Sequence, residues 1–118
     1  MGTYKVLIVD DERVVRDTIQ RWFSLRGFDV ELATNGAEGV AKAIDGGYDA
    51  IIMDLEMPTM GGIEATKMIV EGAGDPVIIA ITGYSENPQA VIDAGAKKVL
   101  LKPLKLNELE ETVLQFVK

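Results

Sequence analysis

The sequence predicts an α/β fold, a single doubly wound sheet of five parallel strands in the order 2-1-3-4-5 with helices on both faces. Five short apolar segments rich in β-branched residues start 23, 20, 28 and 21 residues apart, which leaves room each time for a helix and two loops. The intervening segments carry apolar residues at helical spacing. A chain of 118 residues has the usual size of one domain, so residues 1–118 are expected to form one unit.

The composition of the five predicted strands indicates their order. The first, third and fourth are continuously apolar, as expected for parallel strands covered on both faces, whereas the second alternates and the fifth is short and flanked by lysines. The second and fifth therefore belong at the edges, and right-handed crossovers then give the order 2-1-3-4-5. The predicted strands are Lys5–Asp10, Phe28–Ala33, Tyr48–Asp54, Pro76–Thr82 and Lys97–Lys102.

The first two predicted helices have clear end signals. Glu12–Leu25 carries an apolar stripe and ends before Gly27, which is typical of a helix C-terminus. Asn35 can cap a second helix over Gly36–Asp45, and the pair Gly46-Gly47 ends it.

Three further helices follow in the second half of the chain. Gly62–Glu71 has apolar residues at helical spacing and Gly72 behind it. Ser85–Ala94 is shorter and has Pro88 in its first turn, where a missing N–H costs least. Leu106–Val117 places leucines, valines and a phenylalanine on one face.

Composition excludes several function classes. The chain has 19 acidic and 12 basic residues, a net charge of −7, and neither cysteine nor histidine. Disulfides, thiolate or imidazole metal sites and a histidine general base are therefore excluded, and direct nucleic-acid binding is not expected of so acidic a domain. No apolar run approaches a membrane span of roughly 18 residues and no signal-peptide pattern is present, so we expect a cytoplasmic protein without membrane insertion.

Polar residues stand where four of the predicted strands end. Asp10 and Asp11 follow the first strand, Asp54 ends the third, Thr82 ends the fourth and Lys102 ends the fifth. Each has an ordinary explanation when taken alone, such as a helix cap for the aspartates or a solvated charge for the lysine. Ligands of open α/β sheets bind at the carboxyl ends of the strands beside the switch point. Together these residues therefore indicate one site in that crevice.

The chemistry of such a site follows from its charges. Carboxylates roughly 5 Å apart repel one another by about 3 kcal/mol at an effective dielectric of 20, and Mg²⁺ held by Asp11, Asp54 and a backbone carbonyl would offset this repulsion. We expect Asp54 to attack a phosphoryl group, Mg²⁺ to bridge the two, and Lys102 and Thr82 to bind the remaining oxygens. Gly83 lets the phosphoryl group approach its backbone N–H.

Pro103 directly follows Lys102 in the same predicted crevice. A cis bond before this proline would aim the lysine into the site. A trans proline that simply ends the strand is the commoner form.

These motifs resemble the receiver domain of bacterial two-component response regulators, the CheY-like family, over essentially the whole chain. In order and spacing, the matching set is highly specific. It consists of Val9-Asp10-Asp11-Glu12, Asp54-Leu-Glu-Met-Pro58, Met60-Gly61-Gly62, Ile81-Thr82-Gly83, Gly95-Ala96 and Lys102-Pro103.

The resemblance implies a role for each matching residue. Asp54 corresponds to the phosphoacceptor, Asp10 and Asp11 to the acidic pair that holds Mg²⁺, and Glu56 to the residue whose backbone carbonyl binds the metal. Thr82 and Lys102 match the hydroxyl and ammonium groups that bind the phosphoryl group.

The resemblance also implies partners. The phosphoryl donor would be a phosphohistidine on a sensor histidine kinase or phosphotransfer protein, and the receiver would catalyse only its own phosphorylation and dephosphorylation. Phosphorylation would draw Thr82 toward the phosphoryl group and change the surface of the fourth helix, fifth strand and fifth helix, which a downstream effector protein or fused output domain would read.

Several positions depart from the family pattern. Val99 stands where an aromatic switch residue is common, Gly61 stands where Asp is common, and the fifth helix lacks the basic residues that many transcriptional regulators use to dimerise. Glu56 adds a carboxylate side chain beside the site. Tyr84, two residues after Thr82, is expected to hinder the hydrolytic water, so that Tyr84→Ala would speed loss of the phosphoryl group.

Three other functions are alternatives to a phosphoacceptor domain. An aspartyl phosphatase would also combine Asp, Thr, Lys and Mg²⁺, but it usually places two acids one residue apart and needs room for a cap over its substrate. A degenerate receiver would act only as a protein-binding module. The full set of site residues argues against this function, whereas Val99 leaves it open. An FMN-binding flavodoxin would need a hydroxyl- and glycine-rich phosphate loop where Asp10-Asp11-Glu12 stands.

Overall fold

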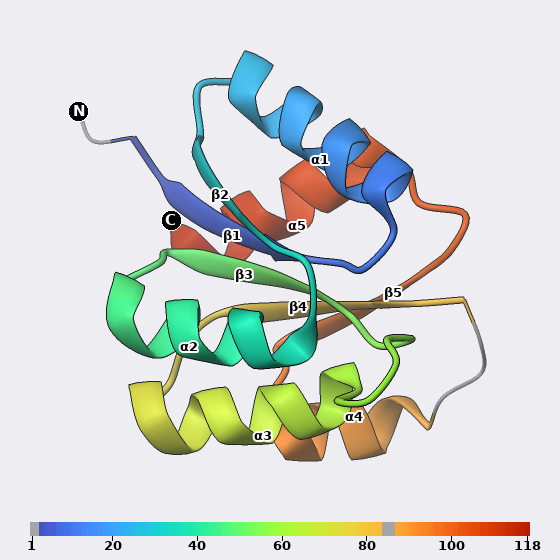
Figure 1. Ribbon diagram of the computed structural model, residues 1–118. Coiled ribbons are helices and arrows are strands. Elements are labelled where there is room, and N and C mark those ends of the chain that lie inside the picture. The colour runs from blue at the N-terminus through green and yellow to red at the C-terminus, as the bar shows by residue number, and fades with distance from the viewer. Residues whose placement is uncertain (1–2, 84–86) are drawn as a thin grey trace.

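A computed structural model describes residues 3–83 and 87–118 and contains the predicted sheet (Figure 1). Five parallel strands lie in the order β2-β1-β3-β4-β5, which confirms the predicted fold class and strand order. The strands are β1 (Lys5–Val9), β2 (Asp29–Ala33), β3 (Ala50–Asp54), β4 (Ile78–Thr82) and β5 (Lys98–Leu101).

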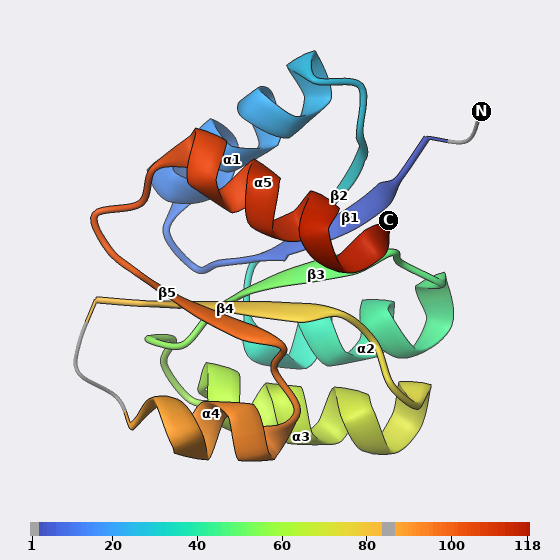
Figure 2. The same ribbon diagram turned by 180° about the vertical axis from the view of Figure 1, so that it is seen from behind.

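Helices cover both faces of the sheet. Figures 1 and 2 show α1 and α5 together on one face and α2, α3 and α4 on the other. Their bounds are α1 (Arg13–Leu25), α2 (Gly36–Gly46), α3 (Gly62–Ala73), α4 (Pro88–Ala94) and α5 (Leu106–Val117). In the described ranges, no helix combines the length and apolar composition that a membrane span requires.

Two hydrophobic cores lie between the sheet and its helix layers, and they explain why the strands differ in composition. Every residue of β3 and β4 is buried, whereas β2 alternates between more and less exposed positions. Leu7 and Ile51 face the core beneath α2, α3 and α4, and Ile8 and Ile52 face the core beneath α1 and α5. A strand that contributes to two cores must be apolar throughout, as the sequence of the central strands indicates.

The C-terminal end of α3 differs from the predicted one. Gly72 does not end α3, which continues to Ala73, and the helix stops at Gly74, whose φ of 85° lies in the region that favours glycine. The predicted start of α4 at Ser85 lies outside the described residues. The described helix begins at Pro88, and Asn87 caps it by accepting a hydrogen bond from the Gln89 amide.

The parallel register brings the carboxyl ends of the strands to one edge of the sheet. Asp54 lies opposite Ile81, and Thr82 lies opposite Leu101. The ladder continues one step beyond β5, where the Lys102 amide donates to the Thr82 carbonyl at 2.9 Å. The described N- and C-terminal segments lie at the opposite edge (Figure 1).

Candidate functional site

Three carboxylates gather where β1 and β3 end. One oxygen each from Asp10, Asp11 and Asp54 lies within 4.8 Å of the others, as expected from the strand order. Asp10 and Asp54 are buried, with 2% and 1% of their surface exposed, and Asp11 is exposed. Of the three aspartates, only Asp11 is exposed, so solvent reaches the cluster from its side.

Asp10 has a structural role as well as its place in the cluster. Its Oδ1 accepts a hydrogen bond from the Glu12 amide at 2.8 Å, and its carbonyl accepts one from Arg16 Nη1 at 2.8 Å. Asp10 thus supports the turn before α1, although Glu12 is the N-cap residue and makes no side-chain cap bond. Burial is the main reason why the pKa of Asp10 is raised, and the neighbouring carboxylates of Asp11 and Glu12 raise it further. The hydrogen bond from the Glu12 amide and the charge of Lys102 lower the pKa but do not cancel the rise.

Asp54 is the most confined acid of the cluster. Its Oδ1 lies 3.3 Å from both the Glu56 amide and Lys102 Nζ. Its buried Oδ2 has no hydrogen-bond partner among the residues that the structure describes. Burial, followed by repulsion from Asp10, raises the pKa of Asp54 from 3.8 to about 6, although Lys102 opposes the rise.

Lys102 is the cation that faces the acids. It follows β5, and its bond to Pro103 is cis, so the less common of the two predicted forms is the one present. Burial lowers the pKa of Lys102, but the carboxylates of Asp54, Asp10 and Glu56 outweigh burial, and the pKa is raised. Lys102 is therefore a permanent cation at neutral pH.

The Glu56 side chain has contacts that the sequence analysis missed. The family resemblance implies a backbone role for Glu56 and a carboxylate that only lies beside the site. In the structure its Oε2 accepts a 2.6 Å hydrogen bond from Thr82 Oγ1, and its Oε1 accepts a 2.7 Å bond from the Gly83 amide. Glu56 Oε1 also lies 3.8 Å from Lys102 Nζ. The only sequence signal was a long acidic side chain two residues beyond Asp54.

The loop from β3 to α3 brings the chain back against the end of β3. Gly61 is the N-cap residue of α3, and the Gly62 amide donates to the Leu55 carbonyl at 3.3 Å. Thr59 has a φ of 69°, which is unusual for a β-branched residue. This tight return sets where Glu56 and the end of β3 lie.

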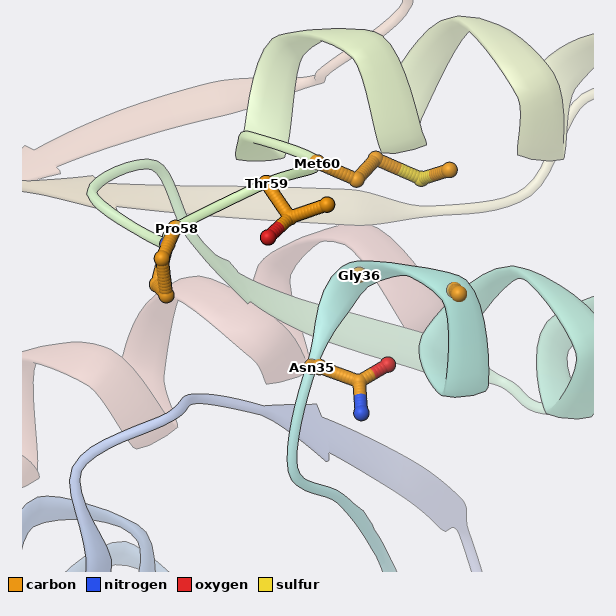
Figure 3. Close-up of a pocket in the computed structure, with 6 residues that line it drawn as sticks. Asn35, Gly36, Pro58, Thr59 and Met60 are labelled. Carbon is orange, nitrogen blue, oxygen red and sulfur yellow. The ribbon is translucent and has the colours of Figure 1, made fainter.

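A hollow next to this loop is separate from the acidic cluster. Figure 3 shows Pro58, Thr59 and Met60 of the loop facing Asn35 and Gly36 at the start of α2. Ala37 completes the lining, which contains no charged side chain. The hollow therefore offers none of the ionisable groups that the predicted chemistry needs.

Two of the positions that depart from the family pattern have different outcomes. Val99 is half-buried on β5 and packs against the core beneath α2, α3 and α4. Because this residue is a valine, the aromatic ring that is common at this position is missing. Tyr84 lies outside the described residues, and its expected effect on hydrolysis stays a prediction.

The cluster fits a hard divalent cation. All three side chains offer oxygen, the ligand type that Mg²⁺ prefers. The buried Asp54 Oδ2 has no partner within the described parts of the chain, which is costly for a carboxylate unless an ion or ligand satisfies it. Asp10, Asp11 and Asp54 could hold such an ion.

Comparison with known proteins identifies a family. The family model described as response regulator receiver domain matches residues 6–114. Response regulator MprA of Mycobacterium sp. (strain KMS) is 35% identical over 107 residues, which cover 89% of this chain and 46% of that protein. The chain thus spans about half the length of the curated relatives it matches.

Solved structures show the same fold. A CheY-like receiver domain protein from Methanospirillum hungatei JF-1 has a TM-score of 0.93, at 26% identity with 98% of this chain and 94% of that chain covered. TrrA from Thermotoga maritima, solved in complex with Mg²⁺ and BeF, has a TM-score of 0.88, at 31% identity over 97% of this chain and 99% of that chain. With the family model matched over most of its length, the chain belongs to the response regulator receiver domain family.

Proposed function

We propose that residues 1–118 form one receiver domain of two-component signalling in which Asp54 accepts a phosphoryl group. The observation that carries the proposal is the Asp54 carboxylate. It is almost fully buried, one of its oxygens faces Lys102, and the other has no partner in the described ranges. We therefore expect Asp54 to react through Oδ2, the oxygen without a hydrogen-bond partner among the described residues.

The transfer step follows from the groups around Asp54. An Asp54 carboxylate oxygen attacks the phosphorus of a phosphohistidine, an O–P bond forms, the N–P bond breaks, and the imidazole leaves with the electron pair and takes a proton from water. Lys102, 3.3 Å from Asp54 Oδ1, compensates the negative charge that gathers on the phosphoryl oxygens. The Thr82 hydroxyl and the Gly83 amide bind the remaining oxygens. Water later attacks the phosphorus, the bond between phosphorus and the Asp54 oxygen breaks, and inorganic phosphate leaves. This returns Asp54 to its carboxylate, so the domain acts only on itself.

Mg²⁺ is the proposed cofactor of this site. Asp10, Asp11 and Asp54 would hold it, together with the backbone carbonyl of Glu56. When bound, it supplies positive charge beside the transferring phosphoryl group. The TrrA structure in complex with Mg²⁺ and BeF supports this assignment by similarity.

The proposed partners follow from the same chemistry. The chain has no histidine, so the phosphohistidine must lie on another protein, a sensor histidine kinase or a phosphotransfer protein. A downstream effector or a fused output domain would read the α4, β5 and α5 surface. Relatives such as MprA, about twice as long as this chain, support the fused arrangement. We place the domain in the cytoplasm, without membrane insertion or direct contact with nucleic acid.

Intact-protein mass spectrometry tests the proposal. The wild type and Asp54→Asn are incubated with acetyl phosphate, with Mg²⁺ or with EDTA. We expect one added phosphoryl group on the wild type with Mg²⁺ only, and none on Asp54→Asn. Asp45→Asn removes an exposed carboxylate from α2 and serves as the matched control, which should be phosphorylated like the wild type.

Two results would contradict the proposal. If the folded wild type gains no phosphoryl group, the site does not act as a phosphoacceptor, and a protein-binding module becomes the favoured function. Repeated turnover of a phosphomonoester would favour an aspartyl phosphatase instead.

A further inference from the structure

The Glu56 carboxylate already occupies groups that a phosphoryl ligand would use. Its two oxygens accept hydrogen bonds from the Thr82 hydroxyl at 2.6 Å and the Gly83 amide at 2.7 Å. Lys102 Nζ lies 3.8 Å from Glu56 Oε1 and 3.3 Å from Asp54 Oδ1, so it stands between the two acids. A single carboxylate therefore contacts three donors on the ends of β4 and β5.

These contacts exclude a second anion at the same donors. The Thr82 hydroxyl and the Gly83 amide each have one proton to donate. A phosphoryl oxygen that receives either proton must therefore replace a Glu56 oxygen. The charges act in the same direction, because a phosphoryl group carries up to about two negative charges and would enter beside the negative Glu56 side chain. Glu56 and a phosphoryl group cannot share this arrangement.

We propose that Glu56 is a built-in competitor of the phosphoryl group, a tethered anion that holds Thr82, Gly83 and Lys102 until Asp54 is phosphorylated. The inference rests on the proposed function, and it assigns Glu56 a positioning role beyond its backbone carbonyl. The side chain is 24% exposed, so it can swing toward solvent when it is displaced. Phosphorylation then exchanges one anionic partner of Thr82 for another.

This competition has two physical consequences. The donors are held in place before the phosphoryl group arrives, since an anion already orders them. The site also binds phosphoryl-like anions less tightly than its donors alone would allow, because only the fraction of molecules with Glu56 displaced can accept them. Removal of the Glu56 carboxylate should therefore increase the affinity for such anions.

Beryllofluoride is the probe for the first measurement, since it can attach to a carboxylate oxygen without a phosphoryl donor. Its affinity is measured in the presence of Mg²⁺ by NMR titration of the wild type, Glu56→Gln and Glu56→Ala. We expect affinity about tenfold higher in both variants, the size expected when a charge-assisted hydrogen bond no longer competes. Glu64→Gln removes an exposed carboxylate from the first turn of α3 with the same change in net charge, and its affinity should equal that of the wild type.

The Gly83 amide gives a second readout that needs neither Mg²⁺ nor beryllofluoride. In the wild type its proton should resonate downfield and exchange slowly with D₂O, because it donates to a carboxylate. In Glu56→Ala it should move upfield and exchange faster, whereas in Glu64→Gln it should not change. Addition of beryllofluoride and Mg²⁺ to Glu56→Ala should restore the downfield position.

The outcomes separate this inference from the proposed function. Equal beryllofluoride affinity in the wild type and both Glu56 variants would overturn the competition and leave the phosphoacceptor role intact. A Gly83 amide that is unchanged in Glu56→Ala would also overturn it. If none of the proteins binds beryllofluoride and none is phosphorylated, the proposed function fails, and the competition fails with it.

Discussion

Gly62 lies against the backbone of Asp54, so closely that a Cβ atom on Gly62 would come within 2.5 Å of the Asp54 carbonyl oxygen and 2.7 Å of Leu55 Cα. Both of these neighbours are backbone atoms that cannot move aside as a flexible side chain would. Gly62, the first residue of α3, therefore limits where β3 can end and with it the position of Asp54, the proposed phosphoacceptor.

Gly62→Ala should both destabilise the protein and disturb the site. Overpacking of this kind typically costs about 1–3 kcal/mol, and the displaced end of β3 should also weaken Mg²⁺ binding. Urea unfolding and Mg²⁺ titration measure the two effects. Gly61→Ala is the matched control, because among the described residues its Cβ would meet nothing closer than the Leu55 carbonyl at 3.7 Å, and its φ is −73°. It should change stability by less than about 1 kcal/mol, and an equal loss in both variants would refute the steric explanation.

Asp54→Asn should stabilise the protein at neutral pH when no metal is present. The folded protein holds a proton on Asp54 up to about pH 6, whereas the unfolded chain releases it near 3.8. The stability that this proton contributes is complete below pH 3.8 and is lost as the pH rises through about 6. The rise in the Asp54 pKa corresponds to about 3 kcal/mol at most.

Urea unfolding in EDTA between pH 4 and pH 7.5 measures this effect. The stability advantage of Asp54→Asn over the wild type should grow as the pH rises and level off above about pH 6.5. Asp45→Asn, which removes an exposed carboxylate, should track the wild type throughout. A stability advantage that does not change with pH would show that folding does not raise the pKa of Asp54.

Mg²⁺ should stabilise the wild type through the acidic cluster. A ligand that binds only the folded state at ten times its Kd adds about 1.4 kcal/mol, which thermal unfolding can detect. Asp11→Asn removes the exposed member of the cluster with little effect on packing, and we expect it to weaken Mg²⁺ binding at least about tenfold. Undiminished stabilisation of Asp11→Asn by Mg²⁺ would place the ion elsewhere.

The sequence predicted which residues come together at the strand ends, because strand order and strand ends follow from local patterns. Asp10, Asp54 and Thr82 each end a buried apolar run, and a parallel sheet brings such ends together. Their convergence depends on the backbone register alone. No side-chain conformation had to be known.

The contacts of Glu56 could not be predicted in the same way. They depend on the return of the loop between β3 and α3, where Thr59 takes a positive φ and Gly62 contacts the end of β3. No pattern in the sequence predicts these two features. The end of α3 illustrates the same limit, since Gly72 and Gly74 look alike in the sequence and only the φ of Gly74 ends the helix.

Lys102→Met should remove the cation that faces Asp54 and keep much of the length and apolar surface of the side chain. The pKa of Asp54 should rise further above about 6, because Lys102 is the main group that lowers it. The chemical shift of the Asp54 carboxyl carbon, followed by NMR against pH in EDTA, reports this change directly. Phosphorylation by acetyl phosphate should fall about 10²-fold or more, the usual effect of removing a group that stabilises charge in the transition state.

Lys98→Met provides the matched control for this variant. Lys98 is exposed at the start of β5, at the opposite end of the strand from Lys102. Its loss changes the net charge equally but leaves the ion pair with Asp54 in place, so both the Asp54 titration and the phosphorylation rate should stay close to those of the wild type. If Lys98→Met shifted the Asp54 titration as far as Lys102→Met does, the effect would come from the overall charge of the domain, and the 3.3 Å contact between Lys102 and Asp54 would not be its cause.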